Sequence, residues 1–214
     1  WTGHGQGYVY IFDLGKFTMV SPLGRTVSSN CSNYNPPYTG PLQISNLNGP
    51  NNSVFGLTNC PGRNDRSLRN KKWDRNLLAD FKAIEDWNTD ALISLNQAGE
   101  FAALGVPEFE KQARTQEFKW YHLPIFDFGV PGPEFNIAWD LHGNDILKTV
   151  TNGGRLVIHC AFGLGRSGTF VAKILTTFGV SPEMAIKQVR NARPGAIESQ
   201  IQEQYITNGQ RLDS

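Results

Sequence analysis

The pattern of apolar and polar positions predicts short strands that alternate with helices from about residue 53 onward. Apolar or alternating runs of strand length lie at residues 54–58, 91–95, 118–123 and 156–158. Apolar positions at helical spacing predict helices at 71–87, 101–116 (in pieces, broken before Pro107), 134–151, 167–178, 182–191 and 199–207. This alternation predicts an α/β fold with a central, mainly parallel sheet that carries helices on both faces.

Residues 1–52 follow another pattern and are rich in Gly, Asn, Ser, Pro and Tyr. Two strand-like runs, at 7–12 and 16–20, flank a short polar turn and predict a hairpin. Residues 33–41 contain the dipeptides Pro36-Pro37 and Gly40-Pro41, which predict a loop. We therefore expect an N-terminal extension of hairpin and loop over residues 1–39, followed by one α/β domain over residues 40–214.

Composition narrows the partners that this chain can have. Its 214 residues carry a formal net charge of only +1, which is not the strongly basic balance of nucleic-acid-binding proteins. No run of about 18 apolar residues is present, so the sequence predicts no transmembrane helix. We expect a monomer without nucleic-acid or membrane partners, in which any affinity for anions comes from a local site.

The three cysteines, Cys31, Cys60 and Cys160, are too few, and odd in number, for a disulfide framework. They favour a reducing compartment, and we expect a cytoplasmic protein; a bond between Cys31 and Cys60 is left open. None of them has the spacing of a zinc site, so neither a metal nor another cofactor is expected.

Residues 157–169 combine a strand end, a short loop and a helix start, the place where parallel sheets bind ligands. Cys160 ends the strand, and Arg166 follows after five intervening residues at the start of the helix. Glycines in the loop allow its backbone to curl, so that several N–H groups point inward at an anion. The helix N-terminus and the planar guanidinium of Arg166 reinforce this, so the segment predicts a phosphate site. The loop residues expected to line the site are Ala161, Phe162, Gly163, Leu164 and Gly165.

The same positive field favours the thiolate form of Cys160, which is a competent nucleophile. A thiolate there can attack phosphorus and form a phosphocysteine, while the amides and Arg166 stabilise the transition state. The simpler alternative is a buried structural thiol at a strand end. Such a thiol does not require two glycines, an arginine and a helix start at these spacings. A nucleotide-binding loop is excluded because no Gly-Lys-Ser or Gly-Lys-Thr follows the glycines.

The run His159, Cys160, five residues, Arg166, Ser167 and Gly168 resembles the signature of the protein-tyrosine phosphatase superfamily. Flanking segments resemble the kinase-associated phosphatases, which are of the dual-specificity type; the similarity covers roughly residues 40–208. These segments are 41–47, 56–57, 60–62, 124–131, 163–167 and 195–198. The resemblance implies a protein-tyrosine-phosphatase-like fold and hydrolysis of phosphotyrosine, phosphoserine or phosphothreonine in proteins.

The resemblance also implies a general acid, an Asp on a mobile loop that protonates the leaving oxygen. Asp127 fits this role because it lies in the Gly- and Pro-rich loop 124–133, after a predicted strand. The simpler alternative is a turn residue, a frequent role of Asp in loops. Asp140 and Asp145 fall inside a predicted helix and are poorer candidates.

The resemblance also implies roles for Ser167, His159 and Gln202. Ser167 helps the thiolate to leave when the intermediate breaks down; the hydroxyl is also a candidate N-cap of the helix. His159 is expected to order the loop from behind rather than to act as a base. Gln202 is expected to position the hydrolytic water, with Arg193 shaping its neighbourhood; the alternative for Gln202 is a solvent-facing helix residue.

The substrate is less well defined by the sequence than the chemistry. Ala161, Phe162 and Leu164 are apolar at loop positions where phosphoinositide phosphatases of the superfamily carry lysines, which favours a phosphorylated protein as substrate. Three alternatives are left open: an inactive phosphate- or phosphoprotein-binding module, a phosphatase of a non-protein phosphate ester, and a sulfur-transfer or arsenate-reducing enzyme.

Overall fold

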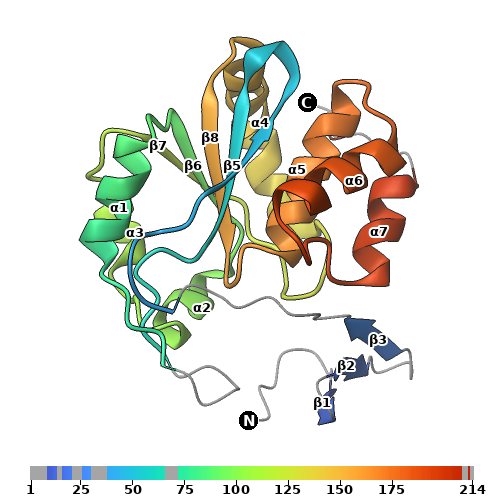
Figure 1. The fold of residues 1–214 in the computed structure, drawn as a ribbon, viewed down its shortest axis with the longest axis horizontal. Coiled ribbons are helices and arrows are strands. Elements are labelled where there is room, and N and C mark those ends of the chain that lie inside the picture. Colours follow the sequence, from blue (N-terminus) through green and yellow to red (C-terminus); the bar gives the residue numbers. More distant parts are fainter. Residues whose placement is uncertain are drawn as a thin grey trace.

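The central sheet has five strands and confirms the predicted α/β fold (Figure 1). The computed structural model describes residues 9–13, 16–20, 26–29, 38–65, 72–208 and 212. Across the sheet the strands run in the order β4 (Ser45–Asn48), β5 (Val54–Asn59), β8 (Arg155–Cys160), β6 (Ala91–Ser94) and β7 (Lys119–His122). Only the edge strand β4 pairs antiparallel; the other pairs are parallel, as predicted.

Helices cover both faces of the sheet, as the sequence predicts (Figure 1). One face carries α1 (Leu77–Asp86), α2 (Ala98–Ala103) and α3 (Phe109–Ala113). The other carries α4 (Pro133–Thr151), α5 (Gly165–Thr177), α6 (Pro182–Ala192) and α7 (Gln200–Thr207). Side chains alternate along β8, so Val157 packs on the first face and Leu156 and Ile158 on the second. In the described part of the chain, no helix has both the length and the apolar character needed to cross a membrane.

The predicted helix at 71–87 is too long at its start, because α1 begins only at Leu77. The side chain of Asn76 caps it by accepting a hydrogen bond from the Ala79 N–H at 2.9 Å. Trp73, which suggested an earlier start, is a fully buried loop residue that packs on Tyr38 and Phe162. Its apolar character therefore reflects tertiary packing rather than helical periodicity.

Two strands were not predicted. In the edge strand β4 only Leu47 is buried, so its mainly polar sequence gave no clear strand signal. The N-terminal hairpin itself is confirmed: β1 (Val9–Asp13) and β2 (Lys16–Val20) pair antiparallel. A third strand, β3 (Thr26–Ser29), extends this sheet beside β2. Cys31 and residues 33–37 of the predicted loop lie outside the described residues.

The topology places the candidate chemistry at the centre of the sheet. Strand β8 lies between β5 and β6, and its last residue is Cys160. Helix α5 begins at Gly165, so only residues 161–164 connect the strand to the helix. The carboxyl ends of β5, β6 and β7 meet β8 at the same edge, so the loops that follow these strands surround Cys160.

A buried ion pair fixes the start of α1 to the turn after β5. Arg75 donates to both carboxylate oxygens of Asp80, at 2.8 and 2.7 Å, and the Gly62 N–H donates to the same carboxylate at 2.8 Å. Replacing Asp80→Ala leaves the buried guanidinium without its carboxylate, and we expect a loss of about 3–5 kcal/mol in the free energy of unfolding. Urea denaturation followed by circular dichroism measures this loss.

Asp86→Ala is the matched control for this prediction. Asp86 lies on the same helix and pairs with Lys82 at 2.6 Å, but both side chains are exposed. Exposed pairs of this kind contribute little, so the control should unfold close to wild type. An equal loss in the free energy of unfolding for the two variants would contradict a large contribution of the buried pair between Arg75 and Asp80 to stability.

Candidate active site

The loop after β8 curls around the sulfur of Cys160. The side chain is buried, and its Sγ accepts a hydrogen bond from the Gly163 N–H at 3.2 Å. Gly163 has a φ of +70°, and a Cβ atom there would lie 2.1 Å from the Thr58 carbonyl oxygen. Only glycine meets both conditions, so this residue permits the inward turn of the N–H groups.

Two buried arginines hold the outer side of the same loop. Arg63 donates to the Ala161 carbonyl at 3.0 Å, and Arg193 donates to the Phe162 carbonyl at 2.9 Å. Asp65 in turn accepts two hydrogen bonds from Arg63, at 2.6 and 3.1 Å. Because these carbonyls point outward to the arginines, the peptide N–H groups of the loop are directed to its inner side.

Arg166 is almost completely buried, and carboxylates surround its guanidinium. Glu100 accepts from both Nη atoms, at 2.6 and 2.9 Å, and the Ile125 carbonyl accepts from Nη1 at 3.0 Å. Asp127 Oδ1 lies 3.1 Å from Nη2. Burial alone would lower the pKa of Arg166, but Asp127 and Glu100 raise it, so the residue stays charged. Among the described residues Nε has no partner, so an incoming phosphate can use Nε and displace Asp127 from Nη2.

Glu100 completes the site and was missed in the sequence. Burial alone would raise its pKa, but Arg166 holds the pKa of Glu100 below its usual value. The carboxylate is therefore ionised beside the guanidinium. Glu100 is the third residue of α2, where it closes a capping box with Gln97. That local role is visible in a sequence, whereas a contact with a residue 66 positions away is not.

Asp127 lies at the mouth of the site with half of its side chain exposed. Desolvation of the carboxyl raises the pKa of Asp127 above its usual value, and the nearby Glu100 acts in the same direction. Arg166 opposes this shift. A raised pKa keeps more of the carboxyl protonated at neutral pH, which suits a proton donor.

The N-terminus of α7 holds the loop that carries Asp127. The Ser199 hydroxyl donates to the Phe128 carbonyl at 3.1 Å, and Gln202 Nε2 donates to the Gly129 carbonyl at 3.1 Å. Gln202 Oε1 accepts from the Glu198 N–H at 3.0 Å. Gln202 is fully buried, so the solvent-facing alternative is wrong. Its observed contacts join the loop that carries Asp127 to α7.

A second carboxylate contacts the anion-binding loop directly. The Gly165 N–H, at the first residue of α5, donates to Glu198 Oε2 at 2.8 Å. This amide was predicted to bind phosphate, but in this structure the protein's own carboxylate accepts its hydrogen bond. Glu198 lies in the segment 195–198 that resembles the family, but its contact with Gly165 was not predicted, because the two residues are 33 positions apart.

His159 and Ser167 lie on either side of the loop, and both are fully buried. Burial lowers the pKa of His159 to about 3, so the ring is neutral, which agrees with a supporting role and not with a base. Ser167 Oγ has no hydrogen-bond partner among the described residues. Helix α5 begins two residues earlier than predicted, so the N-cap alternative for Ser167 is wrong.

Cys60 and Cys160 pack in different apolar cores, although their strands are neighbours. Cys60 packs in the core under α1–α3, whereas Cys160 belongs to the core on the opposite face of the sheet. Both are free thiols, and burial raises the pKa of Cys60 well above its usual range. Charges of the site, from Arg63, Glu100, Cys160 and Arg166, also act on the Cys60 thiol, so it is burial that disfavours its thiolate form.

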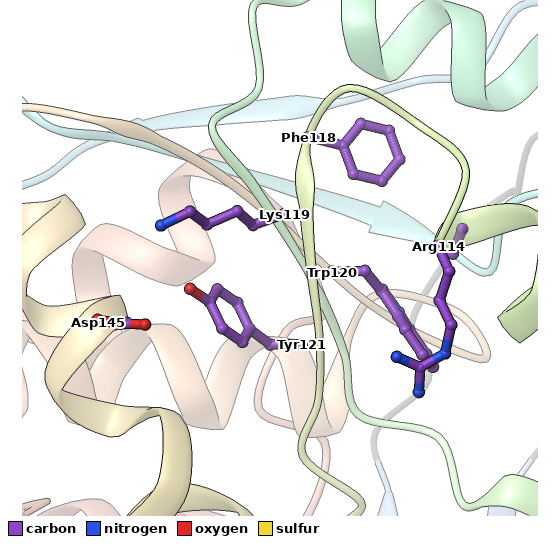
Figure 2. A pocket seen from close by; sticks show the side chains of 7 residues that line it. Arg114, Phe118, Lys119, Trp120, Tyr121 and Asp145 are labelled. Atoms are coloured by element: carbon purple, nitrogen blue, oxygen red, sulfur yellow. The ribbon is translucent and has the colours of Figure 1, made fainter.

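A surface hollow of about 390 Å³ beside β7 lies apart from these residues (Figure 2). Its lining consists of Ala113, Arg114, Phe118, Lys119, Trp120, Tyr121 and Asp145, and none of them was predicted as a site residue. Asp145 belongs to α4, inside a helix as predicted, where it was the poorer candidate for the acid. In this hollow, burial and then Asp145 raise the pKa of Tyr121.

Comparisons with known proteins agree with the geometry. A family model described as "Swiss Army Knife protein, DSP-PTPase phosphatase domain" matches residues 106–206. The chain is 30% identical to human cyclin-dependent kinase inhibitor 3 over 173 residues, which cover 78% of this chain and 77% of that protein. The mouse protein of the same name is 28% identical over 171 residues, with the same shares covered.

A solved structure of kinase-associated phosphatase, in which a serine replaces the catalytic-site cysteine, is also similar. It superposes with a TM-score of 0.67 at 25% identity and covers 78% of this chain and 93% of that chain. The similarity includes the α/β sheet and its helices, so the resemblance predicted from the sequence is confirmed.

Glu198→Gln tests whether the carboxylate at Gly165 competes with anions. Glutamine can still accept the hydrogen bond but carries no charge, so the loop should bind an incoming oxyanion more tightly. We expect the dissociation constant for vanadate to fall by about three- to tenfold, which corresponds to about 1 kcal/mol. Isothermal titration calorimetry measures the constant directly.

Glu183→Gln is the matched control, since Glu183 is an exposed carboxylate in the first turn of α6. This variant removes the same charge from an exposed position on α6, so the affinity for vanadate should stay unchanged. Weaker or unaltered vanadate binding by Glu198→Gln would contradict the competition.

Proposed function

This chain belongs to the dual-specificity protein-tyrosine phosphatases, a family of phosphatase enzymes, and we propose that it hydrolyses phosphate monoesters through a phosphocysteine on Cys160. One observation carries the proposal: the Cys160 sulfur lies inside a loop whose Gly163 N–H donates to it at 3.2 Å. The loop leads directly into Arg166, a buried cation with an unpartnered Nε among the described residues. A nucleophile and an anion clamp thus share one short segment.

In the first step the Cys160 thiolate attacks phosphorus and the bond from phosphorus to the leaving oxygen breaks. The loop amides and the Nε and Nη2 atoms of Arg166 stabilise the equatorial oxygens. Asp127 gives its proton to the leaving oxygen, so the product leaves as a neutral alcohol or phenol. Its raised pKa and half-exposed position support this role.

In the second step a water attacks phosphorus and the bond between sulfur and phosphorus breaks. Asp127, now ionised, takes a proton from the water. The Cys160 thiolate is regenerated, and inorganic phosphate leaves the site. The Ser167 hydroxyl, buried without a partner among the described residues, is suited to donate to the departing thiolate. Gln202, which contacts the loop of Asp127 through Gly129, is proposed to help position the water.

The substrate we propose is a phosphoprotein with phosphotyrosine, phosphoserine or phosphothreonine. Apolar Ala161, Phe162 and Leu164 support this, since a polyphosphorylated ring would call for additional cations in the loop. Phe126, 54% exposed beside Asp127, offers an aromatic contact for a peptide side chain. The human relative is named an inhibitor of a kinase, which favours a protein partner. That the protein is a monomer and lies in the cytoplasm are predictions from the sequence.

Cys160→Ser should abolish turnover of para-nitrophenyl phosphate, because a neutral hydroxyl replaces the thiolate while the anion-binding loop is retained. Calorimetry should still detect vanadate binding by the variant. Wild-type turnover should persist in EDTA and be blocked by vanadate. Phosphopeptide binding without turnover in freshly reduced wild type would instead support a binding module.

Asp127→Asn should lower kcat by roughly 10²–10⁴-fold, because amides do not donate a proton to the leaving oxygen. The acid must be protonated, so the wild-type rate falls as pH rises through the pKa of Asp127, which lies above its usual value. The variant should lose this fall and show a flatter pH profile. A rate and profile equal to wild type would rule out Asp127 as the acid.

A further inference from the structure

A line of hydrogen bonds crosses three neighbouring strands behind the candidate nucleophile. The Trp120 indole N–H, on β7, donates to Ser94 Oγ at 2.8 Å. Ser94 Oγ, on β6, lies 2.5 Å from Nε2 of His159 on β8. Ser94 and His159 are register partners in the parallel ladder, so their side chains leave the sheet on the same face. His159 immediately precedes Cys160.

The directions of these bonds follow from the number of protons available. An indole nitrogen only donates, so Trp120 uses one lone pair of Ser94 Oγ. The single hydroxyl proton of Ser94 then needs an acceptor, and Nε2 of His159 is the one within reach among the described residues. The neutral ring carries one proton, so accepting at Nε2 places that proton on Nδ1.

The rest of the environment fixes the ring but does not choose its tautomer. Phe109 and Phe101 lie against His159 with ring centroids 5.1 and 6.4 Å away, contacts that are the same for either tautomer. The buried Nδ1 atom of His159 has no hydrogen-bond partner among the described residues, although the neighbouring backbone of Cys160 opposes the effect of burial on the pKa of the ring. The Ser94 hydroxyl is thus the hydrogen-bonding group in the described structure that decides which nitrogen of the ring carries the proton.

We propose that Ser94, supported by Trp120, is a positioning residue that sets the Nδ1–H tautomer of His159 and through it the place of Cys160. The proposal rests on the proposed phosphatase function. Ser94 and Trp120 do not touch the reacting atoms; they act through the ring of His159. Trp120 also lines the surface hollow, beside Arg114 (Figure 2), so the line of bonds begins close to solvent.

The test combines nitrogen-15 NMR of histidine-labelled protein with steady-state hydrolysis of para-nitrophenyl phosphate. Wild-type His159 should show a protonated Nδ1 and an unprotonated Nε2 at neutral pH. Ser94→Ala should shift the ring toward the other tautomer and lower kcat by about tenfold with KM within about twofold. Trp120→Phe removes the indole donor and should shift the tautomer in the same direction.

Two further variants separate positioning from general loss of structure. Ser94→Thr keeps the hydroxyl and should retain the wild-type tautomer and most of kcat. Ser53→Ala removes another buried hydroxyl, which bonds the Pro50 carbonyl at 2.7 Å at the start of β5, and should change neither measurement. These variants should retain the wild-type circular dichroism spectrum.

A wild-type ring protonated at Nε2 would overturn the proposal, as would Ser94→Ala with an unchanged tautomer. A changed tautomer with an unchanged kcat would overturn the positioning role. Wild-type protein without any turnover would contradict the proposed function, and the NMR comparison would still decide whether Ser94 sets the tautomer.

Discussion

The arrangement of the site depends on the interactions of the buried Arg166 guanidinium with the acceptors around it. A cation removed from water is tolerated only with carboxylates and carbonyls placed around it. Glu100 from α2 supplies both oxygens, and Ile125 and Asp127 supply further acceptors from the loop after β7. Two segments that are distant from Arg166 in sequence therefore converge on its side chain, next to the loop of Cys160.

Charge balance in the ligand-free site has a consequence for substrate binding. Asp127 contacts Nη2 of Arg166, and Glu198 accepts from the Gly165 N–H, so two carboxylates occupy groups suited to an anion. A phosphate ester has to replace or displace these carboxylates, which reduces the net gain on binding. In the proposed reaction this exchange also frees Asp127 from the arginine as the leaving group requires its proton. Affinity and acid catalysis are thus linked through the same carboxylate.

Elements outside the sheet hold the loops of the site in place. The N-terminal end of helix α7 fixes the loop that carries Asp127 through Ser199 and Gln202. Arg63 and Arg193 fix the outer carbonyls of the anion-binding loop. With the line of bonds behind His159, these contacts hold Cys160, Asp127 and Arg166, the proposed nucleophile, acid and phosphate clamp, on rigid elements, as catalysis by preorganised groups requires.

The sequence by itself determined the strand and helix alternation and the candidate site at residues 159–167. Both are local: periodicity reports which face of an element is buried, and the proposed nucleophile, the glycines and the arginine lie within one short segment. Tertiary structure alone decided the start of α1, the burial of Gln202 and the roles of Glu100 and Glu198. Trp73 is buried by packing within a loop rather than by a helix face. Glu100 contacts Arg166, which lies 66 positions later in the sequence. Such contacts depend on how separate elements are brought together in space, so no short stretch of sequence carries their signal.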